Sequence, residues 1–123
     1  MELEKVALEV AASKAGLNVL KGAVLQGRSG IDHKFAFVAS DGVRSFAFDF
    51  YNGARDVDVL RTFVKKYDTG IEANIISAGS RPTQAAASLA GEYGMKILGT
   101  DSLASFFRPQ LVQPRPTRSA TRA

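Results

Sequence analysis

The chain lacks cysteine, has a single histidine and contains no long apolar run. Without cysteine it forms neither disulfides nor thiolate metal sites, and it suits a reducing compartment such as the cytoplasm. One histidine, His33, excludes an imidazole-rich zinc cluster within one subunit. No segment approaches the roughly 20 apolar residues that span a bilayer, and the acidic, amphipathic first residues do not resemble a signal segment. These absences predict a cytoplasmic protein that works without a membrane.

The composition is that of one globular domain followed by a basic tail. Of the 123 residues, 46% are hydrophobic and 23% charged, which is enough for one sizeable core. Every acidic residue lies at or before Asp101, whereas the segment 108–123 contains four arginines and no acid. The net charge of +4 therefore comes from this segment, and the body is neutral. We expect a domain over 1–107 and a disordered tail over 108–123, in which Arg115 and Arg118 are candidate nucleic-acid contacts.

Hydrophobic periodicity and turn residues predict the order helix, three strands, helix, strand, helix, strand, helix. The expected elements are a helix ending near Gly16, a strand over Asn18–Leu25, a hairpin over Gly30–Tyr51, a helix ending near Gly70, a strand over Glu72–Ala78, a helix between Thr83 and Gly94, a strand over Met95–Leu98 and a final helix from Thr100 or Asp101. This order gives a single α/β domain, with a mixed sheet of an antiparallel hairpin and a parallel βαβ unit flanked by helices. The helix before Gly70 has apolar residues at helical spacing: Val57, Leu60, Phe63, Val64 and Tyr67.

The hairpin carries the chemical lead of the sequence. Asp32 opens its first strand, Asp41-Gly42 makes its turn, and Asp49 lies within an otherwise aromatic second strand. Alternation places the phenylalanines at 46, 48 and 50 on one face, and Asp49 and Tyr51 on the other. A carboxylate inside an apolar strand is costly to bury unless a partner pairs with it.

Short motifs along the chain agree in order and spacing with one family. Gly30-Ile31-Asp32 stands at a strand start, and Phe48-Asp49-Phe50-Tyr51 stands in the second hairpin strand. Further along, Ile75-Ile76-Ser77 precedes a Thr83-capped helix with alanines at 86 and 90. Over about residues 3–107 the pattern resembles the restriction-endonuclease-like fold, in particular Mrr-type restriction endonucleases and more loosely archaeal Holliday-junction resolvases. Those families have Gly-x-Asp at the strand start and Glu/Gln-x-Lys in the next strand.

The resemblance implies a divalent cation, usually magnesium, at which a phosphodiester bond is cleaved. Asp32 and Asp49 would supply its ligands. The lysine of the family motif is missing, because Tyr51 stands in its place. Lys34 lies two residues after Asp32 and could replace the absent ammonium, so the candidate catalytic set is Asp32, Asp49 and Lys34. A glutamate of the first helix, Glu4 or Glu9, could add a third ligand.

Structural roles compete with these functional ones. Asp32 can instead pair with Arg28 or Lys34 across solvent, and Asp49 can be held by hydrogen bonds from Tyr51 or the backbone. Arg28 and Lys34 are also candidate nucleic-acid contacts, together with the tail arginines. Two adjacent lysines, Lys65 and Lys66, complement the end of their helix dipole.

Tyr51 favours a fold that has lost catalysis. We therefore expect a nucleic-acid-associated binding module, a catalytically impaired relative of Mrr-type nucleases that needs no cofactor and pairs as a homodimer. An active magnesium-dependent DNA endonuclease is the alternative. A structural dimerisation or adaptor domain without nucleic acid is the third interpretation.

Overall fold

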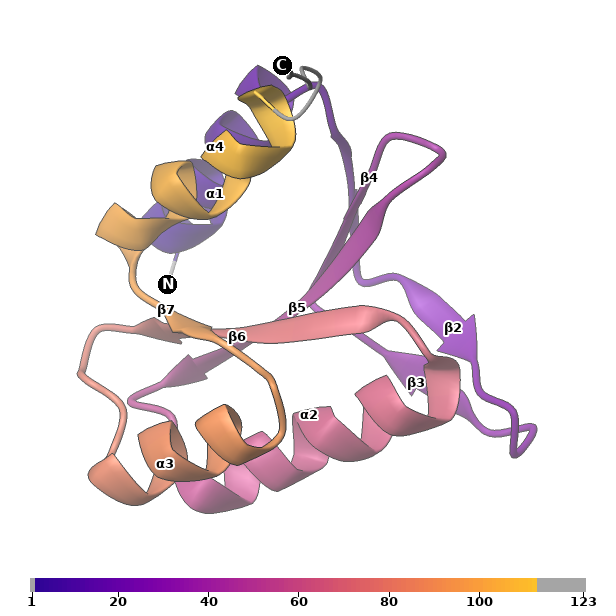
Figure 1. The fold of residues 1–123 in the computed structure, drawn as a ribbon, viewed down its shortest axis with the longest axis vertical. Coiled ribbons are helices and arrows are strands. Elements are labelled where there is room, and N and C mark those ends of the chain that lie inside the picture. Colours follow the sequence, from indigo (N-terminus) through magenta and orange to yellow (C-terminus); the bar gives the residue numbers. More distant parts are fainter. Residues whose placement is uncertain (1, 113–123) are drawn as a thin grey trace, which may run out of the picture.

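The computed structural model describes residues 2–112, and the side chains of residues 5–99 and 101–107 within them. In chain order its elements are α1 (Glu2–Lys14), β1 (Asn18–Lys21), β2 (Val24–Gln26), β3 (Asp32–Lys34), β4 (Phe37–Ser40), β5 (Ser45–Asn52), α2 (Asp56–Thr69), β6 (Glu72–Ala78), α3 (Gln84–Glu92), β7 (Ile97–Leu98), a 3₁₀ turn (Thr100–Ser102) and α4 (Leu103–Val112), as labelled in Figure 1. This order confirms the predicted α/β architecture.

The described residues form a five-stranded sheet in the order β1-β4-β5-β6-β7. β1, β4 and β5 are antiparallel neighbours, whereas β5, β6 and β7 run parallel. The β4–β5 turn is closed by Asp41, whose Oδ1 accepts hydrogen bonds from the backbone N–H groups of Val43 and Arg44 at 2.9 and 2.8 Å. The sheet is therefore mixed, with its antiparallel half supplied by the predicted hairpin.

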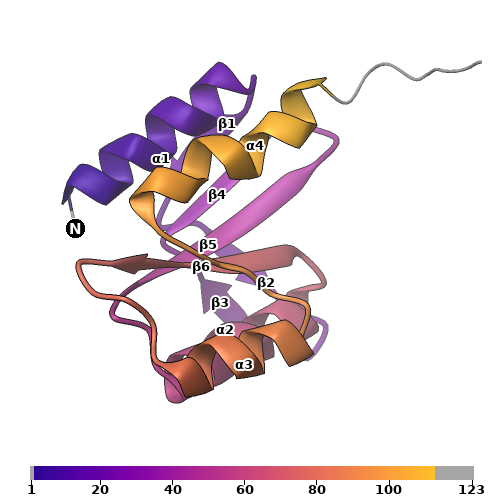
Figure 2. The same cartoon turned by 60° about the vertical axis from the view of Figure 1, so that its left-hand side comes forward.

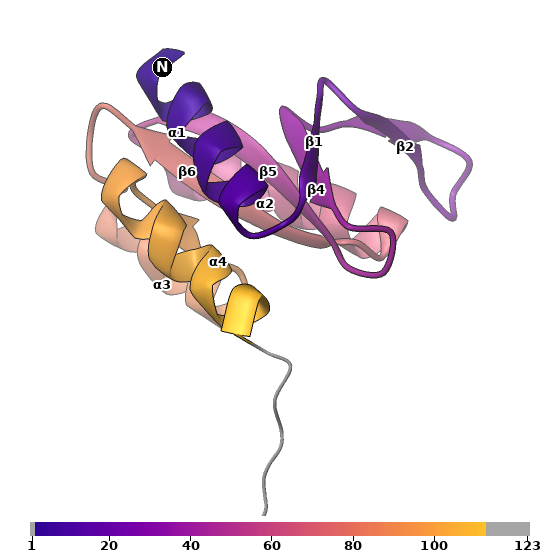
Figure 3. The ribbon, with the colours of Figure 1, turned by 90° about the horizontal axis from the view of Figure 1, so that it is seen from above.

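The first arm of the hairpin is interrupted. β3 leaves the main sheet and pairs with β2, while β4 continues in it after the break at Phe35-Ala36. Phe35 packs with Val38 and Ala47 on one side of the sheet, whereas Ala36 and Phe37 both pack on the other. The flanking registers, Lys21↔Phe37 and Val24↔Lys34, leave two residues on each strand, so both strands bend together here and neither carries an extra residue. Two successive residues on one side nevertheless reverse the facing of the residues before them. The β2–β3 arm projects beyond the main sheet (Figure 3).

Helices cover both faces of the sheet. α1 and α4 lie side by side on one face, and α2 and α3 lie on the other (Figure 2). The α1/α4 face holds the larger core, where Phe46 and Phe48 of β5 meet Phe106 and Phe107 of α4 edge to face, with ring centroids 5.6 to 6.3 Å apart. Such pairs add to the stabilisation from buried apolar area.

The buried face of α2 differs from the one its apolar spacing indicates. The residues that α2 buries are Asp58, Val59 and Thr62. Four of the five apolar residues at helical spacing are instead exposed: Val57, Leu60, Val64 and Tyr67. Phe63 is half-buried and stacks on Tyr93 after α3, with centroids 4.0 Å apart. The polar partners described below explain why the helix presents its polar side to the sheet.

The final helix is longer than expected. α4 continues through Pro109 to Val112, so the predicted boundary at residue 107 falls within it. The prolines made this segment resemble a tail, because proline usually ends or kinks a helix. Residues 113–123 of the predicted tail, including Arg115 and Arg118, lie outside the described residues. Within 2–112, no helix is long and apolar enough to cross a membrane.

Candidate functional site

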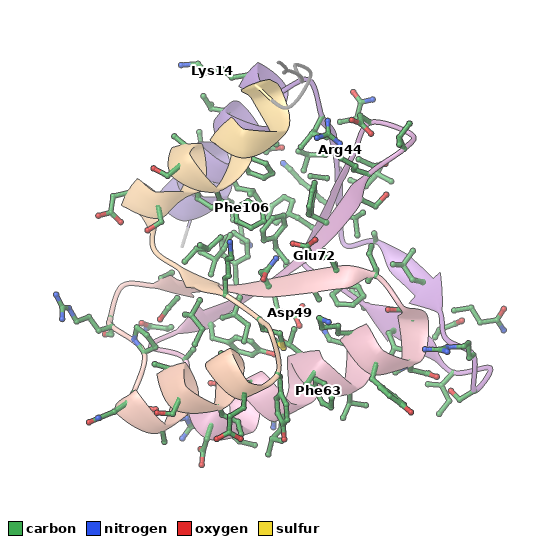
Figure 4. All side chains as sticks on the ribbon, viewed as in Figure 1. Lys14, Arg44, Asp49, Phe63, Glu72 and Phe106 are labelled. Carbon is green, nitrogen blue, oxygen red and sulfur yellow. The ribbon has the colours of Figure 1, made fainter. Side chains whose placement is uncertain are left out.

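Asp49 is buried on the face of β5 that α2 covers, between the sheet and the helix (Figure 4). Thr62 of α2 donates its hydroxyl hydrogen to Oδ2 of Asp49 at 2.6 Å. Lys65 of the same helix places its Nζ 2.9 Å from Oδ1 and 2.8 Å from Oδ2. Thr62 and Lys65 are three residues apart and thus lie on one side of the helix. The carboxylate of Asp49, which would be costly to bury alone, therefore receives one charged and one neutral hydrogen-bond donor from α2.

The ammonium of Lys65 is fixed by three groups. Besides binding Asp49, it donates to the backbone carbonyl oxygen of Lys34 at 2.7 Å. It also lies 4.7 Å from the ring centroid of Phe35, in a cation–π contact. Only 19% of its side chain and 8% of that of Asp49 are exposed. Little solvent separates these charges, so each depends on the other.

Tyr51 completes the network without contributing a base. Its hydroxyl lies 3.2 Å from Oγ1 of Thr62, which links it to Asp49 through the threonine. Burial raises the pKa of the Tyr51 hydroxyl, and the carboxylates of Asp49 and Asp58 add to that rise, while the hydrogen bond with Thr62 opposes it. The phenol therefore stays protonated at neutral pH and supplies no positive charge.

Asp32 and Lys34 do not join Asp49. His33, between them, directs its Nε2 to Asp68 of α2 at 2.7 Å, so its two neighbours face the opposite way. The Lys34 side chain crosses Gly22 and lines a pocket against α1. Asp32 is exposed at the start of β3. The bend at Phe35-Ala36 explains this arrangement, because in a regular strand Asp32 and Lys34 would share the face of Asp49.

The expected metal set is thus dispersed. Glu9 forms an ion pair with Lys21 at 3.3 Å on the α1 side, and the side chain of Glu4 lies outside those described. Among the described residues, no group of three or more histidine or acidic side chains could hold a metal ion. The roles of Asp32, Asp49 and Lys34 in catalysis stay predictions, and the ammonium beside Asp49 belongs to Lys65.

A second polar cluster fixes the loop 27–31 to the end of α2. Asp68 accepts hydrogen bonds from the backbone N–H and the hydroxyl of Ser29 at 3.0 and 2.6 Å, and pairs with His33. The Ser29 hydroxyl, His33 and the Ser29 backbone N–H lower the pKa of Asp68 to about 2. A side chain on Gly27 would collide with this carboxylate. Arg28 donates to the carbonyl oxygen of Tyr67 at 2.8 Å, so its guanidinium has a structural role; its contact with nucleic acid stays a prediction.

The sequence pattern did not single out Thr62 or Asp68, and it assigned Lys65 to the helix dipole rather than to Asp49. A signal for them exists, because Asp58, Thr62 and Lys65 recur at helical spacing along α2. A polar stripe is usually read as the solvated face of a helix. It could be recognised as buried only by matching it to the lone carboxylate of the neighbouring strand.

Comparisons with known proteins find similarity in structure alone. No protein-family model and no curated protein sequence matches the chain. A solved structure described as a protein of unknown function, AF1548, has a TM-score of 0.64 and 17% identity, covering 79% of this chain and 58% of that one. A repair endonuclease from Pyrococcus abyssi has a TM-score of 0.55 and 13% identity, covering 80% and 46%. Protein VC1899 from Vibrio cholerae has a TM-score of 0.57 and 10% identity, covering 86% and 31%.

The chain shares its mixed α/β fold with these structures, one of which is described as a repair endonuclease. It spans 31% to 58% of the length of these three structural neighbours. At such low identity the likeness concerns the arrangement of helices and strands, and residue roles are not transferred.

Proposed function

We propose that this chain is a nucleic-acid-binding module, a catalytically impaired relative of Mrr-type nucleases. The ion pair between Asp49 and Lys65 carries the proposed loss of catalysis, and the fold shared with a repair endonuclease supports a nucleic-acid partner. A cleavage site of this kind needs carboxylates free to hold a divalent cation. Here the single buried carboxylate of the strand is occupied by an ammonium and a hydroxyl of its own chain.

Magnesium does not fit this arrangement. At Asp49 the cation would have to compete with Lys65, whose ammonium already lies 2.9 and 2.8 Å from the two carboxylate oxygens. Asp32, the expected second ligand, faces away from Asp49. Tyr51 cannot replace the missing lysine, since its phenol remains neutral. No catalytic step through a metal therefore follows from these residues.

An active endonuclease is the second candidate, and one observation favours it. Lys65 supplies an ammonium beside a strand carboxylate, which is the pairing that the motif lysine would otherwise provide. In that case α2, rather than β5, would contribute the cation, and a second carboxylate would have to come from outside the described site.

The assay that separates the two candidates uses plasmid and branched DNA with magnesium or manganese. We expect no cleavage by the wild type, together with salt-sensitive binding of labelled DNA. Cleavage that is lost in Asp49→Asn but kept in Asp101→Asn, a change at an exposed carboxylate, would establish the endonuclease instead. If the wild type neither cleaves nor binds DNA at any salt concentration, the adaptor interpretation stands.

Two further expectations accompany the proposal. A homodimer is compatible with the exposed apolar stripe of α2, formed by Val57, Leu60, Val64 and Tyr67. Sedimentation equilibrium of the full chain measures this directly. The cytoplasmic location stays a prediction from the sequence.

A further inference from the structure

We propose that three lysines on the α1 side of the sheet, Lys5, Lys21 and Lys34, form the contact surface for the phosphates of a nucleic acid. This inference rests on the proposed function and names its binding face. That face lies opposite the one that buries Asp49. Binding would therefore use a different side of the sheet from the carboxylate–ammonium pair.

A pocket of about 420 Å³ brings the three lysines together from different parts of the chain. Lys5 comes from the first half of α1, Lys21 ends β1, and Lys34 ends β3. Gly22, which has a φ of +60°, makes room for the arrangement, because the Lys34 side chain passes within 3.4 Å of where a Cβ would stand. The bend at Phe35-Ala36 that turns Lys34 away from Asp49 also directs it to this pocket.

The charge of the pocket is unbalanced. Among the lining residues whose side chains the structure describes, Glu9 is the one carboxylate, and it pairs with Lys21 at 3.3 Å. Three ammonium groups thus share one carboxylate among these described side chains, in a body whose acidic and basic residues are equal in number. Like charges held near one another repel, and a polyanion relieves that repulsion while releasing its own counterions.

The apolar wall of the pocket suits flexible lysines. Val6 and Phe37 line it beside the charged residues. The methylene stems of lysine pack on such surfaces while the ammonium groups reach outward to phosphate oxygens. Contacts of this kind read charge and spacing rather than base sequence.

The test compares three triple variants of the full chain that each remove three positive charges. The pocket variant is K5Q/K21Q/K34Q, the matched lysine control is K14Q/K66Q/K96Q, and the tail variant is R115Q/R118Q/R122Q. Lys14 lies at the far end of α1 from Lys5 (Figure 4), so the control keeps the pocket intact. Because all three lose the same net charge, a difference between them reports local contact rather than the overall field.

Fluorescence anisotropy with a labelled duplex, over a range of salt concentrations, gives the result. We expect the pocket variant to bind at least about tenfold more weakly and to reduce the slope of log K against log salt by about 3, near one unit for each lost phosphate contact. The lysine control should stay within about twofold of the wild type. A K5R/K21R/K34R variant, which keeps the charge, should restore both affinity and slope.

Each other outcome counts against the proposal in a distinct way. If the pocket variant matches the lysine control, the pocket is not the contact surface, although nucleic-acid binding stands. If only the tail variant loses affinity, the contact belongs to the tail arginines. If inorganic phosphate binds the pocket while duplex DNA does not compete, the site takes small anions. If the wild type binds no nucleic acid, the proposed function fails as well.

Folding of the variants is checked by thermal denaturation. Lys21 and Lys34 are exposed, and Lys5 is half-buried, so little stability should be lost. Should loss of the Lys21–Glu9 pair unfold the triple variant, K5Q/K34Q replaces it, with an expected slope reduction of about 2.

Discussion

The two faces of the central sheet are held in different ways. Towards α1 and α4, the sheet presents phenylalanines that pack against Phe106 and Phe107, and stability there follows from volume and apolar area. Towards α2, the same strand presents Asp49, which is stable only because Thr62 and Lys65 meet it. The α1/α4 face is therefore stabilised by apolar packing, whereas the α2 face depends on specific hydrogen bonds and an ion pair. This difference can be measured by breaking each face in turn.

The largest effect is expected on the apolar face. Phe48 is fully buried, and Phe48→Ala should lower the free energy of unfolding by about 3 to 5 kcal/mol, because it removes apolar contacts and leaves a cavity. Urea denaturation followed by circular dichroism measures this. The exposed Val43, with 91% of its surface accessible, provides the control, and Val43→Ala should change stability by less than about 0.5 kcal/mol. Equal losses in both variants would contradict the assigned core.

Breaking the ion pair on the polar face comes next. Lys65→Met should cost about 2 to 4 kcal/mol, because it leaves the buried carboxylate of Asp49 without its charge partner. The double variant Asp49→Val/Lys65→Met should recover part of this loss, since it buries no unpaired charge. Chemical denaturation of Asp49→Val, Lys65→Met and the double variant completes the double-mutant cycle. Additive losses would mean that the two residues are not coupled.

The hydroxyl of Thr62 should matter less. Thr62→Val keeps the shape of the side chain but removes the hydrogen bond to Asp49 and should cost about 1 to 2 kcal/mol. Tyr51→Phe removes only the weaker, 3.2 Å contact and should cost less than Thr62→Val does. The reverse order would show that Tyr51, not Thr62, stabilises the carboxylate.

The smallest change in folding stability at neutral pH is expected at Asp68. This contribution to stability is lost in acid. The pKa of Asp68 is lowered from 3.8 to about 2 in the folded chain, mainly by Ser29 and His33. A carboxyl group with a lowered folded pKa contributes stability above its unfolded pKa and loses it as the pH falls through the folded one. The stability difference between wild type and Asp68→Asn should therefore shrink between about pH 4 and pH 2. Denaturation midpoints over this range test it, and a constant difference would contradict the assignment.

The apolar face and the order of elements could be predicted from the sequence, because both follow from local periodicity. The alternation of phenylalanines at 46, 48 and 50 marked the side that α1 and α4 cover, and Asp41-Gly42 marked the turn. The buried face of α2 could not be predicted in the same way. Its apolar stripe was the stronger local signal, but Asp49 requires donors, and these stand on the other side of the helix.

The grouping of Asp32 and Lys34 with Asp49 depended on a regular strand. A bend at Phe35-Ala36 reverses the facing of the residues before it, and the alternation of residue types in this segment does not mark where the bend falls. The same bend directs Lys34 to the pocket with Lys5 and Lys21. The same irregular position thus separates the residues of the expected metal site and brings together the lysines of the proposed phosphate contact.

The most direct test of the account asks whether Asp49 binds a metal ion. Manganese titrated into isotopically labelled protein broadens the amide NMR signals of residues close to any site that it occupies. We expect no selective broadening of Phe48, Asp49 and Phe50, because Lys65 and Thr62 already occupy the carboxylate. Selective broadening of these three signals that disappears in Asp49→Asn would contradict it.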